Sequence, residues 1–295
     1  MSKTQQAIAL ALVAVLCWSG NWVVGRSVRA EVPPMGLNFW RWSVAVLLLT
    51  PFALPGLIRE WAALRAGWKP LVGLGVLGAT MFQSMVYLGL QTTEAINALL
   101  LNATGPIFTI VIARIILRDR VTTRQVLGIA ISFLGVAWLV LRGDLQMVQT
   151  LGFAVGDIWI VAAMFVWGLY SVLLRYKPQA SDLTIVYAIG VIGAAFMAPL
   201  WIWELAQGIQ MQMNRPTGLS VAYVAVFASI IAFLSFNASV AVIGPTKAVT
   251  FLHFMPVFGS IMAIVFLGER LAFYHLTGFP VVMLGVLLAT TSNRT

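Results

Sequence analysis

Two stretches of this chain share one arrangement of residues. Residues 97–140 read NALLLNATGPIFTIVIARIILRDRVTTRQVLGIAISFLGVAWLV, and residues 247–290 read KAVTFLHFMPVFGSIMAIVFLGERLAFYHLTGFPVVMLGVLLAT. Each has an apolar run with a proline, a polar break in which arginine follows an acidic residue, and an apolar run with two glycines. The matching residues are all 150 positions apart: Pro106 and Pro256, Asp119-Arg120 and Glu269-Arg270, Gly128 and Gly278, Gly135 and Gly285. This constant spacing indicates an internal duplication.

The composition is too apolar for a soluble protein. Hydrophobic residues make up 61% of the 295 positions and charged residues only 9%, with a mean hydropathy of +0.95. Soluble domains carry about 25% charged residues. The apolar runs are about 20 residues long, which suits membrane-spanning helices and exceeds the ~10 residues of a barrel strand. We therefore expect an all-α integral membrane protein, with the first run retained as a span rather than cleaved as a signal.

Ten spans are expected, at residues 5–26, 36–56, 69–90, 95–117, 122–141, 151–174, 183–206, 218–241, 245–267 and 272–291. The net charge of +9 is scattered at the ends of these runs, which favours loops at a membrane surface over a nucleic-acid-binding face. With a cytoplasmic N-terminus, 12 of the 18 Lys and Arg residues lie inside, so both termini are predicted to be cytoplasmic. The single cysteine, Cys17, excludes a disulfide within the chain.

The duplication divides the ten spans into two five-helix repeats, residues 1–146 and 147–295. Because five is odd, the second repeat is expected to cross the membrane in the opposite sense to the first. Inverted repeats are typical of secondary transporters, with the substrate site near the bilayer midplane between the halves. The first spans agree, since Trp18 and Arg26 are each 149 positions before Trp167 and Arg175.

These motifs resemble those of the drug/metabolite transporter superfamily, and within it the ten-span group with two EamA-type repeats. The resemblance rests on the two prolines, the two acidic-arginine pairs and the glycine pairs, and it covers nearly the whole chain. The full sequence is most similar to the YddG-type exporters of bacteria. That similarity implies export of aromatic and other amino acids across the inner membrane, although the motifs are specific for the superfamily and not for a substrate.

Several polar and aromatic residues are predicted to line one pathway in two layers. Equivalent positions pair Asn21 with Tyr170, Trp22 with Ser171, Tyr87 with Asn237 and Asn97 with Lys247. Gln83 and Ser235 add polar groups on the third and eighth spans, and Trp18, Trp159 and Trp167 are candidates for an aromatic pocket. For each of them, helix–helix hydrogen bonding, packing or lipid contact is the alternative.

His253 and the two prolines are further candidates. His253 lies near the centre of the ninth span, and the equivalent position holds Ala103. We predict that His253 contacts substrate or water in a cavity. A buried histidine bonded to a neighbouring helix is the alternative, and a proton-carrying role is a third option because histidine titrates near neutral pH. Pro106 and Pro256 are predicted to kink spans four and nine as hinges. The glycine pairs of spans five and ten predict close helix packing instead of pathway lining.

Together these features predict a secondary transporter that exports small metabolites, with amino acids first, by alternating access. It is expected to contact membrane lipid and a small-molecule substrate, without cofactor, metal or nucleic acid, and the oligomeric state stays open with a monomer as one option. The alternative is a phosphorylated-metabolite or nucleotide-sugar exchanger, which needs cations facing the cavity. Lys247 is the candidate for that role, because Arg41 and Arg114 are placed towards span ends. An integral membrane enzyme is disfavoured, since no paired carboxylates, histidine cluster or Ser-His-Asp set is visible in the sequence.

Overall fold

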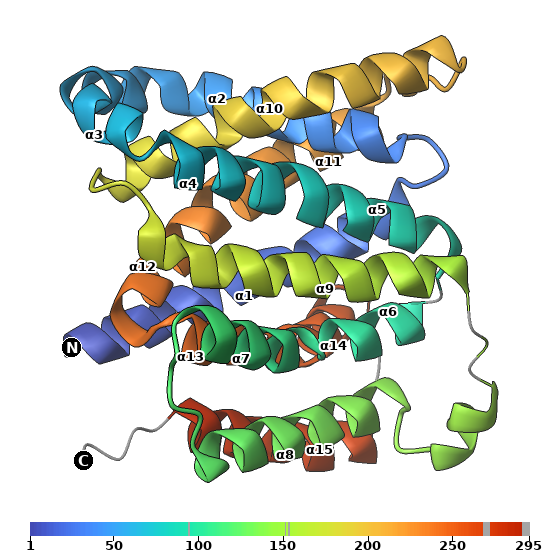
Figure 1. The fold of residues 1–295 in the computed structure, drawn as a ribbon. Helices are drawn as coiled ribbons and strands as arrows, with labels where there is room; N and C mark the ends of the chain where they lie inside the picture. Colours follow the sequence, from blue (N-terminus) through green and yellow to red (C-terminus); the bar gives the residue numbers. More distant parts are fainter. Residues whose placement is uncertain (94, 151, 153, 268–271, 291–295) are drawn as a thin grey trace.

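The computed structural model describes residues 1–93, 95–150, 152, 154–267 and 272–290, and shows helices joined mainly by short loops (Figure 1). In chain order the α-helices are α1 (Lys3–Ser27), α2 (Pro34–Arg59), α3 (Trp61–Ala66), α4 (Trp68–Leu74), α5 (Phe82–Thr92), α6 (Ala95–Asn102), α7 (Gly105–Ile116), α8 (Thr123–Val140), α9 (Val155–Leu173), α10 (Asp182–Ala206), α11 (Arg215–Tyr223), α12 (Ala232–Ile243), α13 (Pro245–Thr250), α14 (Met255–Leu267) and α15 (Phe273–Thr290). The 3-10 segments are η2 (Leu145–Thr150), η3 (Leu174–Tyr176) and η5 (Phe251–Phe254), and the π-helical segments are η1 (Gly75–Met81) and η4 (Val224–Ile231).

Within the described residues, eight helical stretches are long and apolar enough to cross a membrane. They are Lys3–Gly25, Pro34–Arg59, Trp68–Thr92, Thr123–Val140, Val155–Tyr176, Asp182–Ala206, Arg215–Ile243 and Phe273–Thr290. A shorter apolar helix, Leu100–Ile116, lies in the fourth predicted span. The ninth predicted span corresponds to α13, η5 and α14, after which residues 268–271, including Glu269 and Arg270 of the repeated motif, lie outside the described part. The total of ten spans and the inversion of the repeats stay predictions.

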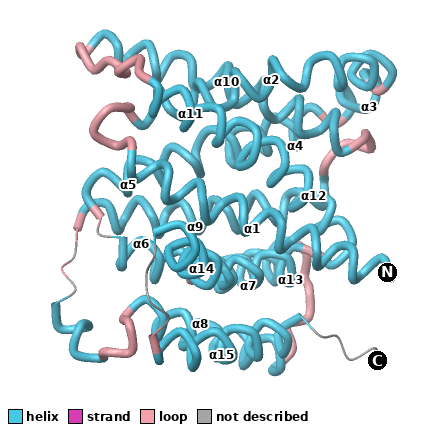
Figure 2. The backbone as a smooth tube through the Cα atoms, turned by 180° about the vertical axis from the view of Figure 1, so that it is seen from behind, coloured by secondary structure: helices cyan, strands magenta, loops and turns pink. Residues whose placement is uncertain are grey.

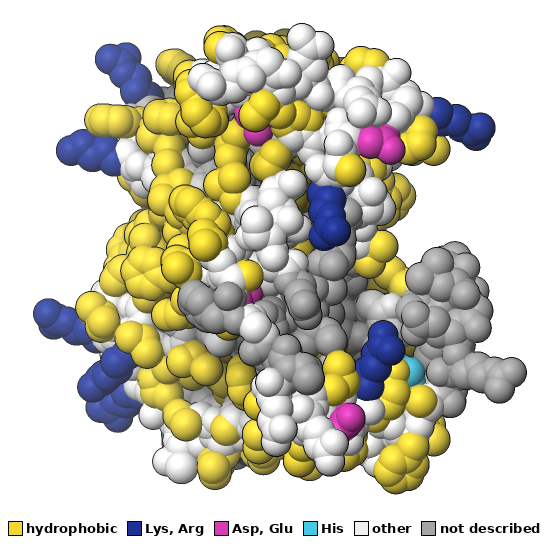
Figure 3. Space-filling view, turned by 90° about the vertical axis from the view of Figure 1, so that its right-hand side faces the viewer, with side chains coloured by type: hydrophobic (Ala, Val, Ile, Leu, Met, Phe, Trp, Pro, Cys, Tyr) yellow, Lys and Arg dark blue, Asp and Glu magenta, His cyan; other side chains and the backbone are white. Residues whose placement is uncertain are grey.

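The spans run between two ends of the molecule, with loops at both (Figure 2). α1 begins and α15 ends at the same end, on the left in Figure 1. At that end the Ser181 amide donates to the Glu60 carboxylate at 3.0 Å, and at the opposite end the Asn214 side chain donates to Glu31 at 2.6 Å. Figure 3 views the opposite end, where the visible Lys and Arg side chains lie both at the outline and on the face and form no single patch. Which end faces the cytoplasm stays a prediction.

α8 and α15 pack against each other through the predicted glycine pairs, in the lowest layer of Figure 1. A Cβ on Gly128 would lie 2.4 Å from the Ala289 backbone nitrogen and 2.7 Å from the Gly285 carbonyl oxygen. A Cβ on Gly285 would lie 2.3 Å from the Ser132 backbone nitrogen. Backbone cannot yield to these contacts as a flexible side chain can. The packing role predicted for these glycines is therefore confirmed.

The other helices pack in pairs that join the two repeats. α2 packs against α10, α1 against α12, and α5 against α9. The third span combines α4, η1 and α5 in one continuous helix, and the eighth combines α11, η4 and α12. η1 and η4 start 149 positions apart, at Gly75 and Val224. π-Helical turns are rare and occur frequently at functional sites. Side chains next to η1 and η4 are therefore candidates for the functional site.

Pro106 and Pro256 each follow a local departure from regular α-helix. Pro106 is the second residue of α7, after a break at Ala103 and Thr104 that separates α7 from α6. Pro256 is the second residue of α14, after the 3-10 segment η5. Proline is well tolerated in the first turn of a helix, where its missing N–H has no intrahelical acceptor. Both prolines therefore lie in the first turn of an α-helix, after two turn residues in the fourth span and a 3-10 segment in the ninth, and the predicted kinks stay a prediction. The hinge role stays a prediction.

Candidate functional site

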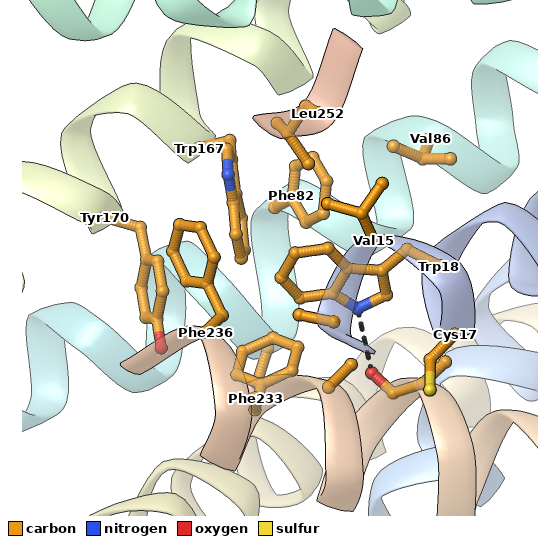
Figure 4. Packing of buried hydrophobic residues seen from close by; sticks show 14 of the residues in the cluster. Val15, Cys17, Trp18, Phe82, Val86, Trp167, Tyr170, Phe233, Phe236 and Leu252 are labelled. Atoms are coloured by element: carbon orange, nitrogen blue, oxygen red, sulfur yellow. Dashed lines mark hydrogen bonds between the residues drawn. The ribbon is translucent and has the colours of Figure 1, made fainter. Parts of the chain in front are cut away.

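A cluster of aromatic rings fills the centre of the molecule between α1, α5, α9 and α12. We define this central aromatic cluster by its five large rings, Trp18, Phe82, Trp167, Phe233 and Phe236 (Figure 4). The Trp18 and Trp167 rings meet edge to face with their centroids 4.9 Å apart, and Phe82 lies 4.5 Å from Trp167. Phe236 lies 4.9 Å from Trp167 on the α12 side. The structure therefore brings together Trp18 and Trp167, as predicted, whereas Trp159 is 39% exposed and is not one of the rings of the cluster.

Two tyrosine–asparagine hydrogen bonds cross the same four helices. In the first pair the Tyr87 hydroxyl on α5 donates to Asn21 Oδ1 on α1 at 2.9 Å. In the second pair the Tyr170 hydroxyl on α9 donates to Asn237 Oδ1 on α12 at 2.8 Å. The four side chains are buried. Asn21 is equivalent to Tyr170 in the other repeat, and Tyr87 is equivalent to Asn237. The two hydrogen-bonded pairs are therefore equivalent to each other, except that tyrosine and asparagine have changed places.

The two pairs lie towards opposite ends of the molecule. Asn21 is six residues before the last residue of α1, about 9 Å along the helix. Asn237 is likewise six residues before the last residue of α12. α1 finishes at the right-hand end of Figure 1, and α12 finishes at the left-hand end, where the N-terminus lies. The aromatic cluster thus has one polar pair towards each end.

Several buried hydrogen-bond donors around the cluster have no partner among the described residues. They include Gln83 Nε2 on α5, Trp167 Nε1 on α9 and Asn237 Nδ2 on α12. Each side chain is no more than 2% exposed. A buried donor without an acceptor costs about 1–3 kcal/mol. A bound solute that supplies carbonyl or carboxylate oxygens offsets that cost, so these donors suit a polar ligand.

Arg41 is the functional candidate that sequence reasoning missed. It lies seven residues into the 26-residue α2, which agrees with its predicted place towards a span end, but its side chain is 0% exposed. Its Nε donates to Ser229 Oγ at 2.5 Å, its Nη2 donates to the Ala228 carbonyl at 2.8 Å, and its Nη1 is 3.5 Å from the Tyr87 hydroxyl. Trp18 Nε1 donates to the same Ala228 carbonyl at 3.0 Å, drawn as a dashed line in Figure 4. A positive charge inside a predicted span was the signal that could have found it.

His253 lies outside the aromatic cluster, in η5. It is 0% exposed, and both ring nitrogens have protein partners: Nε2 lies 2.9 Å from the Ala103 carbonyl and Nδ1 lies 2.5 Å from Ser132 Oγ. Ala103 is the position equivalent to His253 in the other repeat, and it lies at the break between α6 and α7. This geometry suits the alternative reading, a buried histidine bonded to neighbouring helices, and its role as a substrate ligand stays a prediction.

Of the last equivalent pair, Asn97 and Lys247, only Lys247 has a described side chain, and it lies in a pocket away from the cluster. The side chain of Asn97 lies outside the described residues. Lys247 is half-buried in α13 and lines a pocket of about 210 Å³ with Arg120 and Arg175, at the end where the N-terminus lies. Asp119 also lines that pocket, so its positive charge is partly balanced.

Sequence comparison relates this chain to a family of transporters. The family model described as the EamA-like transporter family matches residues 5–141 and again residues 154–291. The uncharacterized transporter YyaM of Bacillus subtilis is 29% identical over 262 residues, which cover 87% of this chain and 84% of that protein. A probable terminal-alkyne amino-acid exporter of Streptantibioticus cattleyicolor is 25% identical over 287 residues, covering 97% of this chain and 94% of that protein.

A solved crystal structure shares the fold. It superposes with a TM-score of 0.76 at 18% sequence identity, covering 97% of this chain and 96% of the other. The apolar helices and the two family matches indicate a multi-pass membrane transporter. The chain belongs to the EamA-like transporter family.

Proposed function

We propose that this transporter exports amino acids, including aromatic ones, and related small metabolites by alternating access, and that it is not an enzyme. One observation carries the proposal: an aromatic cluster bordered by unpaired donors lies between two Tyr–Asn pairs at opposite ends. The rings suit an apolar or aromatic side chain, because aromatic groups favour edge-to-face and offset stacking. The unpaired donors suit the carboxylate or carbonyl oxygens of the same solute.

The packing supports two inverted halves, residues 1–146 and 147–295. α1 packs on α12 and α9 packs on α5. Since α1 is equivalent to α9 and α12 to α5, each of these contacts is the equivalent of the other. The α2–α10 and α8–α15 contacts map onto themselves. In alternating access the first Tyr–Asn pair separates in one state and the second pair separates in the other, while the cluster holds the solute.

The amino-acid substrate is supported by two similarities. The chain resembles YddG-type exporters in sequence, and the Streptantibioticus cattleyicolor relative is described as a probable terminal-alkyne amino-acid exporter. A phosphorylated-metabolite exchanger is the second candidate, supported by the pocket that Arg120, Arg175 and Lys247 line. That pocket lies at one end of the molecule and includes Asp119, whereas such an exchanger needs cations at the midplane.

Counterflow in proteoliposomes tests the proposal. Vesicles preloaded with an unlabelled solute should accumulate the labelled solute faster than protein-free vesicles, using L-phenylalanine, other L-amino acids, phosphate esters and nucleotide sugars. Trp167→Phe removes one unpaired donor and should slow exchange. Trp203→Phe is the matched control, because Trp203 is 59% exposed on α10. Exchange of phosphate esters alone would favour the second candidate, and no exchange of any solute would refute transport of these classes.

Topology is tested separately. We propose a bacterial inner-membrane location with both termini in the cytoplasm. Cysteines introduced at Lys3 and Arg120 should react only from the cytoplasmic side, and one at Asp144 only from the outer side. Reaction of all three from one side would remove the inverted repeat.

A further inference from the structure

Arg41 is a fully buried cation without a carboxylate partner among the described residues. It lies about 10 Å along α2 from the start of the helix at Pro34. Its hydrogen-bond acceptors are a serine hydroxyl, a tyrosine hydroxyl and a backbone carbonyl, all of them neutral. The two ion pairs in the described part join Arg59 to Glu60 and Lys177 to Asp182, both at one end of the molecule. Charged side chains are costly within a membrane span and usually mark a substrate or ion pathway.

The surroundings of Arg41 connect it to the proposed pathway. The Tyr87 hydroxyl donates to Asn21 and accepts from Arg41 Nη1, so the first Tyr–Asn pair lies directly on the guanidinium. On the other side, the Ala228 carbonyl accepts from both Arg41 Nη2 and Trp18 Nε1. Arg41 therefore lies between the first Tyr–Asn pair and an edge of the central aromatic cluster.

The guanidinium is unevenly engaged. Nε and Nη2 make bonds of 2.5 and 2.8 Å, whereas Nη1 is 3.5 Å from the Tyr87 hydroxyl, at the limit of a hydrogen bond. Separation of α1 from α5 would move Tyr87 and uncover Nη1. The planar fork of arginine then presents N–H groups in the geometry that a carboxylate accepts.

The two repeats differ here. A shift of 149 or 150 positions from Arg41 leads to Gly190 or Val191, neither of which carries a charge. A Cβ on Gly190 would lie 3.0 Å from the Trp42 ring, so that position packs against α2. Arg41 therefore has no charged equivalent in the second repeat, and it lies on the side of the cluster where α1 ends. An anion bound there would be held near one Tyr–Asn pair and not the other.

We infer that Arg41 is the carboxylate-binding group of the pathway, reached when the Asn21–Tyr87 pair separates. The inference rests on the proposed transport function and narrows its substrates to solutes with a carboxylate. Ser229 and the Ala228 carbonyl hold the guanidinium in place through its Nε and Nη2. The Tyr87 hydroxyl occupies the place that the substrate oxygen takes on opening.

Equilibrium dialysis of the purified protein tests the inference. Labelled L-phenylalanine and L-phenylalaninamide share a side chain and an amino group, and only the first has a carboxylate. The wild type should bind the acid more tightly than the amide, on the order of 10- to 100-fold, as expected for charge-assisted hydrogen bonds. Arg41→Gln should reduce that ratio to about one by weakening acid binding alone. Arg41→Lys keeps the charge without the fork and should give an intermediate ratio.

Two further variants separate binding from support of the fold. Arg29→Gln removes an exposed arginine towards the same end and should leave the ratio unchanged. Ser229→Ala removes an Arg41 partner while keeping the charge, so it should lower the melting temperature and keep the preference for the acid. If Arg41 only stabilises the packing of α2 against η4, Arg41→Gln and Ser229→Ala should lower the melting temperature by similar amounts. Neither variant should then change the ratio of acid to amide binding.

The outcomes are distinguishable. Wild-type protein that binds the amide as well as the acid, or binds neither, overturns the inference, and so does an Arg41→Gln or Arg41→Lys variant that is folded and keeps the full ratio. In each case counterflow by the wild type still stands as a test of transport. A wild type that exchanges none of the solute panel refutes the proposed function and the inference with it.

Discussion

Removing the two tyrosine hydroxyls should shift the transporter in opposite directions. Tyr87→Phe removes the 2.9 Å bond to Asn21, and Tyr170→Phe removes the 2.8 Å bond to Asn237. In the proposed mechanism, each bond is made only while its end of the pathway is closed. Tyr87→Phe should therefore favour opening at the end where α1 finishes, and Tyr170→Phe opening at the end where α12 finishes.

The size of the shift follows from the strength of such bonds. Hydrogen bonds between membrane helices average about 0.6 kcal/mol and reach about 1.7 kcal/mol. Loss of one bond thus changes the ratio of the two open states by about 3- to 18-fold. Because the signs are opposite, the two variants should differ from each other by about 8- to 300-fold.

Cysteine accessibility measures this ratio. Cys17 is replaced by alanine, and single cysteines are placed at Leu90 or Leu173, each three residues beyond the tyrosine of its pair. A membrane-impermeant thiol reagent should label Leu90→Cys faster in the Tyr87→Phe background and more slowly with Tyr170→Phe, and Leu173→Cys should show the reverse.

Tyr187→Phe is the matched control. The Tyr187 hydroxyl makes a 3.4 Å contact with Thr50 between α10 and α2, so its loss should leave both labelling rates unchanged. Shifts of the same sign in Tyr87→Phe and Tyr170→Phe would refute the assignment of the two pairs to opposite gates.

Three further predictions concern stability, each measured by the melting temperature of purified protein. Gly128→Val should lower stability by about 1–3 kcal/mol, because the added side chain meets the backbone of α15. Gly218→Ala is the control and should leave stability unchanged, because a Cβ there meets nothing within 4 Å. Equal effects of the two substitutions would contradict the packing role of Gly128. If His253 is a buried histidine bonded to neighbouring helices, His253→Ala should cost on the order of 1 kcal/mol of stability through its lost hydrogen bonds and leave substrate affinity unchanged; a changed affinity at normal stability would instead support the predicted cavity contact. Hydrogen bonds from the Thr184 hydroxyl and the Ser181 amide lower the pKa of Glu60 from 4.5 to about 2. The ionised Glu60 carboxylate therefore stabilises the fold fully above pH 4.5, and this stabilisation is lost as the pH falls towards 2. Glu60→Gln should abolish this part of the acid dependence of the melting temperature.

Much of the helical framework could be predicted from the sequence because it depends on local properties. Continuous apolar runs have to form helices in a membrane, since lipid offers no partners to unpaired backbone groups. Helix α8 and the glycines that pack it against α15 followed from hydropathy and a seven-residue spacing. The repeat register also paired Asn21 with Tyr170 and Tyr87 with Asn237, although it did not show that the hydrogen bonds join Asn21 to Tyr87 and Tyr170 to Asn237.

The candidate site depended on contacts between distant parts of the chain. Pro106 was expected to kink a helix, but whether a span bends or breaks there depends on partners such as His253, which contacts the Ala103 carbonyl at that break. The sequence placed Arg41 towards a span end but could not show what surrounds it on other helices. Only the tertiary structure shows that it is buried: Ser229 and the Ala228 carbonyl, almost 190 positions away, supply the hydrogen bonds that allow a guanidinium to be buried. Such a charge is tolerated only where neighbouring helices replace the water it has lost.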